Sequence, residues 1–401
     1  MTARLTIRGV RLIDGIADEA RANVDVTVED GRIAAIGAAS EVPPPDGTTI
    51  IDGAGQTLLP GLIDCHSHYP IDTTVDDGFE SFRHDPDTLI ALRAAGAARR
   101  ALESGVTTSR SAGSPGAFDY VLRDAITAGF AQGPRILAAG PAMTITGGHG
   151  WPFGRECDSV TEFIRGVRAN VRDGAEVIKA VASEAAMLSG WDQGAGGAEM
   201  TEDELRAVVD EAARLHRRVL AHAQGGEAVR RAAQAGVASV EHAFLAEEAD
   251  LEVLKSSGAT LVPTLSVTDV WRTIEGLTPV SRSRQDYIEP LHRRSCETAI
   301  RMGIPIATGT DCGVRGVTSD MVAREVRLIH EHGASAMTAI HGATSIAART
   351  LGLEAEIGTV EPGKRADLLL VDGDPLSDLR CLERVRVVVK GGAIVHRVAA
   401  A

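Results

Sequence analysis

The middle of the chain alternates apolar, strand-like runs with amphipathic helical stretches, and this rhythm constrains the fold more than any other feature. One helical stretch begins at Thr201 with Glu204 three residues later, which is the spacing of a capping box. Another ends at Gly236, a residue type that commonly terminates helices. The eight strand candidates are Thr57–His66, Gly105–Arg110, Arg135–Gly140, Glu176–Val181, Val219–Ala223, Ser239–Ala243, Thr260–Leu265 and Ile304–Asp311.

Eight such strand–helix units over about 290 residues have the size of a TIM barrel. A doubly wound open sheet is the rival architecture, but no Gly-x-Gly-x-x-Gly motif follows the first strand. Both ends of the chain are instead rich in short strand-like segments, with an Asp30-Gly31 turn near the N-terminus. We therefore expect an α/β fold in which a (β/α)8 TIM barrel spans residues 60–353. Residues 1–59 and 354–401 then build one small β-sandwich domain from both termini.

Composition indicates the cellular location and the classes of partner to expect. No apolar run approaches the roughly 20 residues that cross a bilayer, and the N-terminus lacks the apolar core of a signal peptide. We expect a cytoplasmic protein that binds no membrane. The formal net charge of −14 argues against a nucleic-acid partner, so the expected partners are a small-molecule substrate and further copies of the chain in a homo-oligomer. The five cysteines contain no Cys-x-x-Cys pair, which disfavours a structural zinc knuckle.

Polar side chains recur where the predicted strands end. His66 and His68 close the first strand, and side chains two apart on a strand point to the same side. The other polar residues at strand ends are Lys179, His222, His242 and Asp311. Each alone has a simpler structural interpretation, such as a hydrogen-bonded histidine or a capping aspartate. The carboxyl ends of barrel strands meet at one mouth, however, so their joint placement favours a metal site made of imidazole and carboxylate ligands.

Longer motifs resemble the amidohydrolase superfamily, whose members combine a (β/α)8 barrel with a small β-sandwich. Pro60–His68 is similar to the strand-one motif of that superfamily, and Thr308–Asp311 is similar to its strand-eight aspartate. The run Ala343–Leu353, followed by Gly358–Leu368, is similar to its passage from barrel to sandwich. For the branch with a lysine on strand four, the resemblance implies two divalent metal ions. It assigns His66, His68 and Asp311 to the first metal, His222 and His242 to the second, and a carbon dioxide-derived carbamate on Lys179 to the bridge.

The resemblance implies a hydrolase of carbon–nitrogen bonds, and the chemistry of these residues agrees with it. A desolvated lysine loses its proton readily, and the neutral amine can then add carbon dioxide. Two metals that share a water lower its pKa to about 7. Asp311 is then placed to act as the general base and afterwards as the general acid. We expect Zn²⁺, although these ligand types also suit manganese, iron and cobalt.

The segment after the third strand holds the main candidate for substrate binding. Gly147-Gly-His149-Gly150 resembles the branch that contains Xaa-Pro dipeptidases and imidazolonepropionase-like proteins. His149 is therefore predicted to bind a carbonyl oxygen or a terminal carboxylate. Arg155 is a candidate for a bidentate carboxylate clamp, and Tyr287 for a contact from a helical lid predicted over residues 267–294. The expected substrate is an N-acyl amino acid or a dipeptide.

Other readings of the substrate stay open. The run Arg110–Gly113 and the segment after Lys179, residues 182–190, differ from runs that are common in peptidase members. Hydrolysis of a cyclic amide, or of a xenobiotic amide, carbamate or ester, is the alternative. A non-catalytic binding protein is a remote alternative, because such a protein is expected to have lost ligands. A mononuclear deaminase is disfavoured because Glu227 lies five residues beyond His222, outside the usual His-x-x-Glu spacing.

Overall fold

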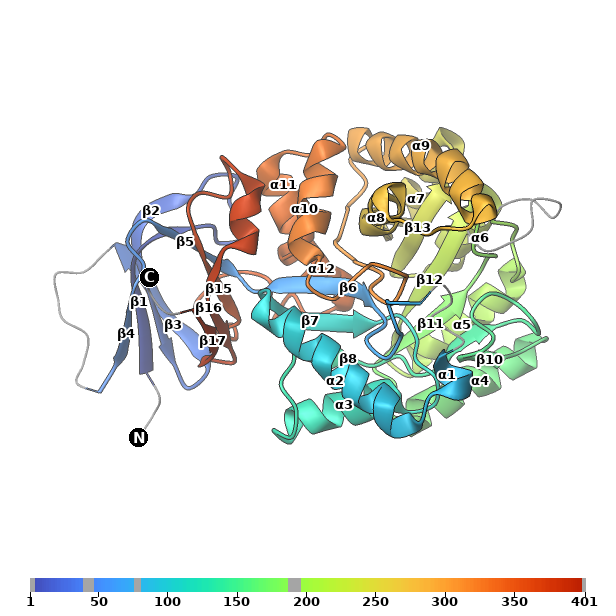
Figure 1. The fold of residues 1–401 in the computed structure, drawn as a ribbon, viewed down its shortest axis with the longest axis horizontal. Helices are drawn as coiled ribbons and strands as arrows, with labels where there is room; N and C mark the ends of the chain where they lie inside the picture. Colours follow the sequence, from blue (N-terminus) through green and yellow to red (C-terminus); the bar gives the residue numbers. More distant parts are fainter. Residues whose placement is uncertain (1–3, 39–46, 76–80, 187–195, 399–401) are drawn as a thin grey trace.

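The computed structural model describes residues 4–38, 47–75, 81–186 and 196–398, and it shows a barrel beside a smaller β-domain (Figure 1). The predicted fold class is confirmed. Residues 187–190 of the segment after Lys179 lie outside the described residues. Among the helices that the structure describes, none is both long and apolar enough to cross a bilayer.

The β-domain joins strands from both ends of the chain. Its sheet has the order β17-β16-β15-β5-β1-β2-β3, and β4 pairs with β1. The strands are β1 (Arg4–Leu12), β2 (Arg21–Glu29), β3 (Arg32–Ala38), β4 (Thr49–Asp52), β5 (Gln56–Pro60), β15 (Leu368–Asp372), β16 (Val385–Lys390) and β17 (Ala393–Arg397). The central pairing is antiparallel, with Leu369 of β15 opposite Leu59 of β5. Ile7, Val26 and Leu370 belong to one apolar cluster, so this domain has its own core made from both termini.

Parallel strands form the barrel. They are β6 (Leu62–Ser67), β7 (Val106–Ser111), β8 (Arg135–Leu137), β9 (Ala142–Thr144), β10 (Gly154–Glu156), β11 (Val177–Val181), β12 (Arg218–Gly225), β13 (Ser239–Leu245) and β14 (Thr260–Val262). One sheet has the order β6-β7-β8 and the other β10-β9-β11-β12-β13-β14. The backbone N–H of Glu176 donates to the carbonyl of Ala138 at 2.8 Å, which joins the two sheets between β8 and β11.

The eighth predicted strand, Ile304–Asp311, differs from the prediction because it makes one isolated bridge, between Ile306 and Leu261, and no regular strand. Pro305 has no N–H to donate, and Asp311 has a φ of 56°, which is outside the β region. The segment still closes the barrel: Ala307 N–H donates to Leu261 on one side, and Cys65 N–H donates to Thr308 on the other, both at 2.9 Å. We call residues 304–311 the closing segment.

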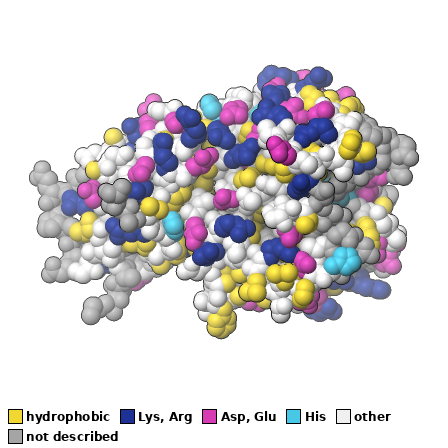
Figure 2. Space-filling view, in the orientation of Figure 1, with side chains coloured by type: hydrophobic (Ala, Val, Ile, Leu, Met, Phe, Trp, Pro, Cys, Tyr) yellow, Lys and Arg dark blue, Asp and Glu magenta, His cyan; other side chains and the backbone are white. Residues whose placement is uncertain are grey.

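Helices surround the barrel (Figure 1). They are α1 (Ser81–His84), α2 (Asp87–Glu103), α3 (Phe118–Thr127), α4 (Val160–Asp173), α5 (Glu202–Arg214), α6 (Gly226–Ala235), α7 (Glu248–Ser257), α8 (Leu265–Thr273), α9 (Pro279–Arg301), α10 (Val322–Glu331), α11 (Ala336–Gly342) and α12 (Ser345–Leu351). The capping box of Thr201 and Glu204 is confirmed, as is the left-handed Gly236 that ends α6. The segment predicted to be helical over residues 267–294 is confirmed as parts of α8 and α9. On the face drawn in Figure 2, basic and acidic side chains are interspersed.

Candidate metal centre

One buried cavity at the mouth of the barrel is lined by all six predicted ligands. They come from β6 and the residue after it, from β11, β12 and β13, and from the end of the closing segment. The exposed fractions are 1% for His66, 8% for His68, 3% for Lys179, 4% for His222, 2% for His242 and 8% for Asp311. Side chains that are separated by up to 245 positions in the sequence (66 to 311) therefore surround one small volume.

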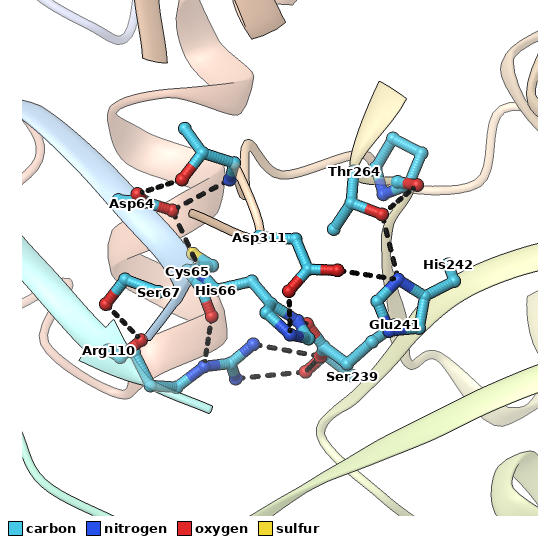
Figure 3. A network of polar contacts seen from close by, with 12 residues as sticks. Asp64, Cys65, His66, Ser67, Arg110, Ser239, Glu241, His242, Thr264 and Asp311 are labelled. Atoms are coloured by element: carbon cyan, nitrogen blue, oxygen red, sulfur yellow. Dashed lines mark hydrogen bonds and ion pairs between the residues drawn. The ribbon is translucent and has the colours of Figure 1, made fainter. Parts of the chain in front are cut away.

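Asp311 lies at the centre of the first predicted ligand group. Its Oδ1 is 3.3 Å from Nε2 of His66 and 3.5 Å from Nε2 of His68. The ligand atoms of these three residues all lie within 4.8 Å of one another. Asp311 is held in the left-handed backbone region, so its side chain leaves the closing segment at an unusual angle and lies between His66 and His242 (Figure 3). Two imidazoles and one carboxylate in this arrangement are a suitable ligand set for a divalent cation.

His222 and His242 form the second predicted group. Their ring centroids are 4.5 Å apart, and Nδ1 of His242 is 3.9 Å from Oδ2 of Asp311. Nδ1 of His242 also lies 2.8 Å from the Thr264 hydroxyl, which leaves Nε2 as the ligand atom. Nε2 of His222 is buried and has no hydrogen-bond partner among the described residues. A buried, unpaired imidazole nitrogen is costly, and a bound metal ion would supply its partner. The residues therefore fit the binuclear centre.

The protonation states of the site also suit metal binding. Burial lowers the pKa of His68 to about 3 and holds the pKa values of His222 and His242 well below their ordinary range. Neutral imidazole is the form that binds metals. Burial lowers the pKa of Lys179 to about 8, although nearby carboxylates oppose that shift. Burial alone would raise the pKa of Asp311, but His66, His68 and Lys179 together outweigh it and hold that pKa well below the usual value.

A buried ionic network orients His66, and sequence reasoning missed it. Oε2 of Glu241 lies 2.7 Å from Nδ1 of His66, and Oε1 of Glu241 accepts a hydrogen bond from Nη2 of Arg110 at 2.9 Å (Figure 3). Arg110 also donates to the Ser239 hydroxyl at 3.0 Å and to the carbonyl of Cys65 at 2.6 Å. Burial would raise the pKa of Glu241, but Arg110 and the His66 hydrogen bond lower it to about 2. The ionised carboxylate thus holds the proton of His66 on Nδ1 and leaves Nε2 to ligate.

A second buried carboxylate ties the strand of His66 to the closing segment. Oδ1 of Asp64 accepts from the backbone N–H groups of His66 at 3.1 Å and Thr310 at 3.0 Å, and Oδ2 accepts from the Thr310 hydroxyl at 2.7 Å. Burial raises the pKa of Asp64 to about 6 despite these donors. Asp64 therefore links the backbone of His66 to Thr310, the residue before Asp311, and so fixes the relative positions of these two candidate ligands.

The three predicted substrate contacts have different positions. His149 lines the cavity, its ring centroid is 4.5 Å from that of His222, and its backbone N–H donates to Glu199 at 2.9 Å. Burial lowers the pKa of His149 to about 4, so its ring is neutral. Arg155 lies on β10, where it donates to Asn170 at 3.2 Å, and Tyr287 on α9 is 49% exposed. Neither Arg155 nor Tyr287 is among the residues that line the cavity.

The wall of the cavity outside the ligands is mainly apolar. It includes Phe153, Val181, Phe244, Val267 and Trp271. Val267 and Trp271 belong to α8, so the predicted helical segment does line the mouth through its first part. Cys65 and Cys312, which flank ligand positions in the sequence, are buried and are not among the cavity-lining residues.

Comparison with known proteins gives consistent matches over nearly the whole chain. The model of the "Amidohydrolase family" matches residues 57–395. Ochratoxinase from Aspergillus niger is 30% identical over 419 aligned positions, which cover 96% of this chain and 85% of that protein. The crystal structure of a Xaa-Pro dipeptidase with bound methionine in the active site has a TM-score of 0.88 at 29% identity, covering 98% and 99% of the two chains. A prolidase complexed with N-methylphosphonate-L-proline has a TM-score of 0.87 at 28% identity, covering 98% and 100%.

Proposed function

Since the chain belongs to the amidohydrolase family, with a buried group of metal-ligand residues at the barrel mouth, we propose that it hydrolyses the C–N amide bond of an N-acyl amino acid or a dipeptide. The observation that carries this proposal is the ionised Asp311 between two imidazoles at the floor of an apolar cavity. A carboxylate in that position can accept a proton from water and return it to a departing amine.

The residues that would hold the metals are those named from the sequence. His66, His68 and Asp311 would hold one ion, His222 and His242 would hold the other, and Lys179 as a carbamate would supply an anionic oxygen ligand. The two divalent cations, for which we propose zinc, supply Lewis acidity toward the scissile carbonyl and make water more acidic. Burial in the cavity favours the neutral amine of Lys179, which is the form that adds carbon dioxide. The carbamate converts a repelled cation into an anionic oxygen ligand.

The chain's own side chains then carry the proton and hold the substrate. Asp311 takes a proton from the attacking water through its carboxylate and delivers it to the leaving nitrogen as the C–N bond breaks. The neutral His149 ring, beside His222, binds the carbonyl oxygen or the terminal carboxylate. Because Arg155 and Tyr287 do not line the cavity, we assign neither of them to substrate binding.

The walls of the cavity favour an apolar substituent on the substrate. Phe153, Phe244 and Trp271 offer aromatic surface, and burying an apolar group against such surface is favourable by about 25 cal/mol for each Å². The name of the similar Xaa-Pro dipeptidase supports a dipeptide substrate. A second candidate is a cyclic amide, which is supported by the 28% identity to imidazolonepropionase from Micrococcus luteus.

A substrate panel tests the proposal. The zinc-loaded protein is assayed by mass spectrometry with dipeptides, N-acyl amino acids of graded acyl size, and lactams. We expect zinc-dependent cleavage of the linear amides, with kcat/KM rising from acetyl to benzoyl derivatives. Cleavage of lactams alone would replace the first candidate by the second. A metal-loaded protein that cleaves no C–N bond in the panel would refute the proposed function. The cytoplasmic location and the homo-oligomer stay predictions.

A further inference from the structure

Gln224 lines the cavity beside the predicted metal ligands. It lies on β12 two residues beyond His222, and residues two apart on a strand face the same side. Ala223, between them, is buried in the main apolar cluster. The exposed fraction of Gln224 is only 5%. Its amide group therefore projects into the barrel mouth from the same wall as His222.

The orientation of this amide is fixed by its neighbours. The backbone N–H of Ala186 donates to Oε1 of Gln224 at 2.6 Å. Since a backbone N–H can only donate, the amide oxygen must face Ala186 and the Nε2 group must face the other way. The Ser183 hydroxyl accepts a hydrogen bond from the backbone N–H of Gln224 at 3.0 Å, which anchors this part of the strand. No described residue accepts a hydrogen bond from Nε2.

Nε2 is not among the fully buried side-chain atoms that lack a partner, so it is open to the cavity that Gln224 lines. A donor that opens into a cavity is available to an acceptor on a bound ligand. The wall of this cavity outside the predicted metal ligands is mainly apolar, with Val181 and Phe244 among its residues. A substrate bound in the cavity can therefore supply an acceptor for Nε2.

The position of Gln224 indicates which substrate oxygen accepts from its Nε2. Gln224 shares its strand face with His222, whose unpaired Nε2 marks the place of a metal ion. In the proposed reaction the carbonyl under attack would lie next to the metals, and more distant substituents would lie against the apolar walls. We propose that Nε2 of Gln224 donates a hydrogen bond to the oxygen of that carbonyl, so that Gln224 is a catalytic residue; this inference rests on the proposed amide hydrolysis.

The hydrogen bond strengthens as the reaction proceeds. The carbonyl oxygen is neutral in the substrate and gains negative charge when water attacks the carbon, and bonds to charged acceptors are stronger. Gln224 neither gains nor loses a proton in this step. A fixed donor in a buried site is worth more to the transition state than to the ground state, because it needs no reorganisation.

Two variants and a control test the proposal. Gln224→Glu keeps the oxygen that accepts from Ala186 and removes the NH2 group, whereas Gln224→Met removes both. Ser183→Ala weakens the anchoring of the same strand without changing the amide. Each zinc-loaded variant is assayed with the amide that the wild type cleaves fastest. Calorimetry then measures the affinity for the N-methylphosphonate derivative of the amino acid in that substrate and for the amino acid itself.

We expect kcat/KM to fall about 100-fold in both Gln224 variants, the size typical of one lost donor to a developing oxyanion. Affinity for the phosphonate should fall by a similar factor, affinity for the product amino acid should change little, and zinc content should stay that of the wild type. Ser183→Ala should stay close to wild type in all of these measurements.

Wild-type kcat/KM in both Gln224 variants would overturn the assignment, as would a loss in Ser183→Ala as large as theirs. Equal weakening of phosphonate and product binding would also overturn it, because the donor would then act only in ground-state binding. These results test Gln224 alone, because they are measured only when the wild type cleaves an amide. If the wild type cleaves no amide, the proposed function itself is refuted.

Discussion

Replacing Glu241 by glutamine changes one atom of a fully buried side chain. We nevertheless expect it to move the proton of the candidate metal ligand His66 from Nδ1 to Nε2. Oε1 of Glu241 accepts from Arg110 at 2.9 Å and from the Ser239 hydroxyl at 2.5 Å, so these two donors will hold the oxygen of the new amide in the same place. The amide nitrogen must then occupy the position of Oε2, 2.7 Å from Nδ1 of His66. Because that nitrogen donates, Nδ1 must accept, and the proton of a neutral His66 moves to Nε2. A protonated Nε2 cannot ligate a metal.

The expected loss follows from this change of tautomer. Removing the partner that orients a ligating histidine typically costs about 10–100-fold in metal affinity, which is about 1.4–2.7 kcal/mol. The unfolding free energy of the metal-free protein should fall as well. Arg110 is only 1% exposed, and in this variant it loses the negative charge of Glu241 that balances its own. Loss of one partner of a buried ion pair costs about 3–5 kcal/mol. Since Arg110 keeps a hydrogen bond to the amide oxygen, we expect the lower end of that range.

Zinc affinity is measured by competition with a chromophoric chelator, and the stability of the metal-free protein by urea unfolding. Ser239→Ala is the matched control. It removes a hydroxyl that contacts the same carboxylate oxygen, at a cost of about 1 kcal/mol in stability, and leaves the contact between Glu241 and His66 in place. Its zinc affinity should therefore stay near that of the wild type. If Glu241→Gln binds zinc as tightly as the wild type while its stability falls, Glu241 has only a structural role and the tautomer explanation is wrong.

The remaining predictions concern the ligands and the pH dependence of stability. Lys179→Ala should lose metal and activity together and regain part of both with added short carboxylates, as measured by elemental analysis and turnover; a fully active variant would exclude the bridge. Asp311→Asn should lower kcat by about 100-fold or more in molecules that retain metal, because proton transfer is lost, and near-normal kcat would remove that role. His149→Ala should raise KM or lower kcat/KM at unchanged metal content, whereas loss of metal would make His149 a ligand. Glu241 has its pKa lowered from 4.5 to about 2 in the folded protein, so its stabilisation is present above pH 4.5 and is lost as pH falls toward 2. The difference in unfolding free energy between wild type and Glu241→Gln should therefore narrow over that range; a constant difference would contradict the assigned pKa.

The grouping of the six candidate ligands could be predicted from the sequence because they stand at the ends of apolar strands, where the barrel brings them together. Alternation along each strand predicts only part of their geometry. On β13, Ser239 and Glu241 both contact Arg110, so a regular strand would turn His242 to the opposite face. His242 has a φ of 74° instead, and this left-handed conformation breaks the alternation and turns its ring to the mouth. Asp311, with a φ of 56°, leaves the closing segment in the same way.

The buried charges that contact the candidate ligands, and the walls of the cavity, could not be predicted in the same way. The reason differs between the two. Glu241 and Arg110 are visible in the sequence as charges within apolar strands, but their partners lie 175 and 131 positions away, at His66 and Glu241 respectively. Only the closed barrel shows that the two charges compensate each other. Substrate contacts depend on segments between the strands, whose paths have no simple period. His149 lines the cavity from such a segment. Arg155, six residues later, donates a hydrogen bond to Asn170 of α4 instead and is not among the residues that line the cavity. Specificity therefore has to be sought in α8 and in the segment of His149, and changes there should alter the substrate while the candidate metal ligands stay in place.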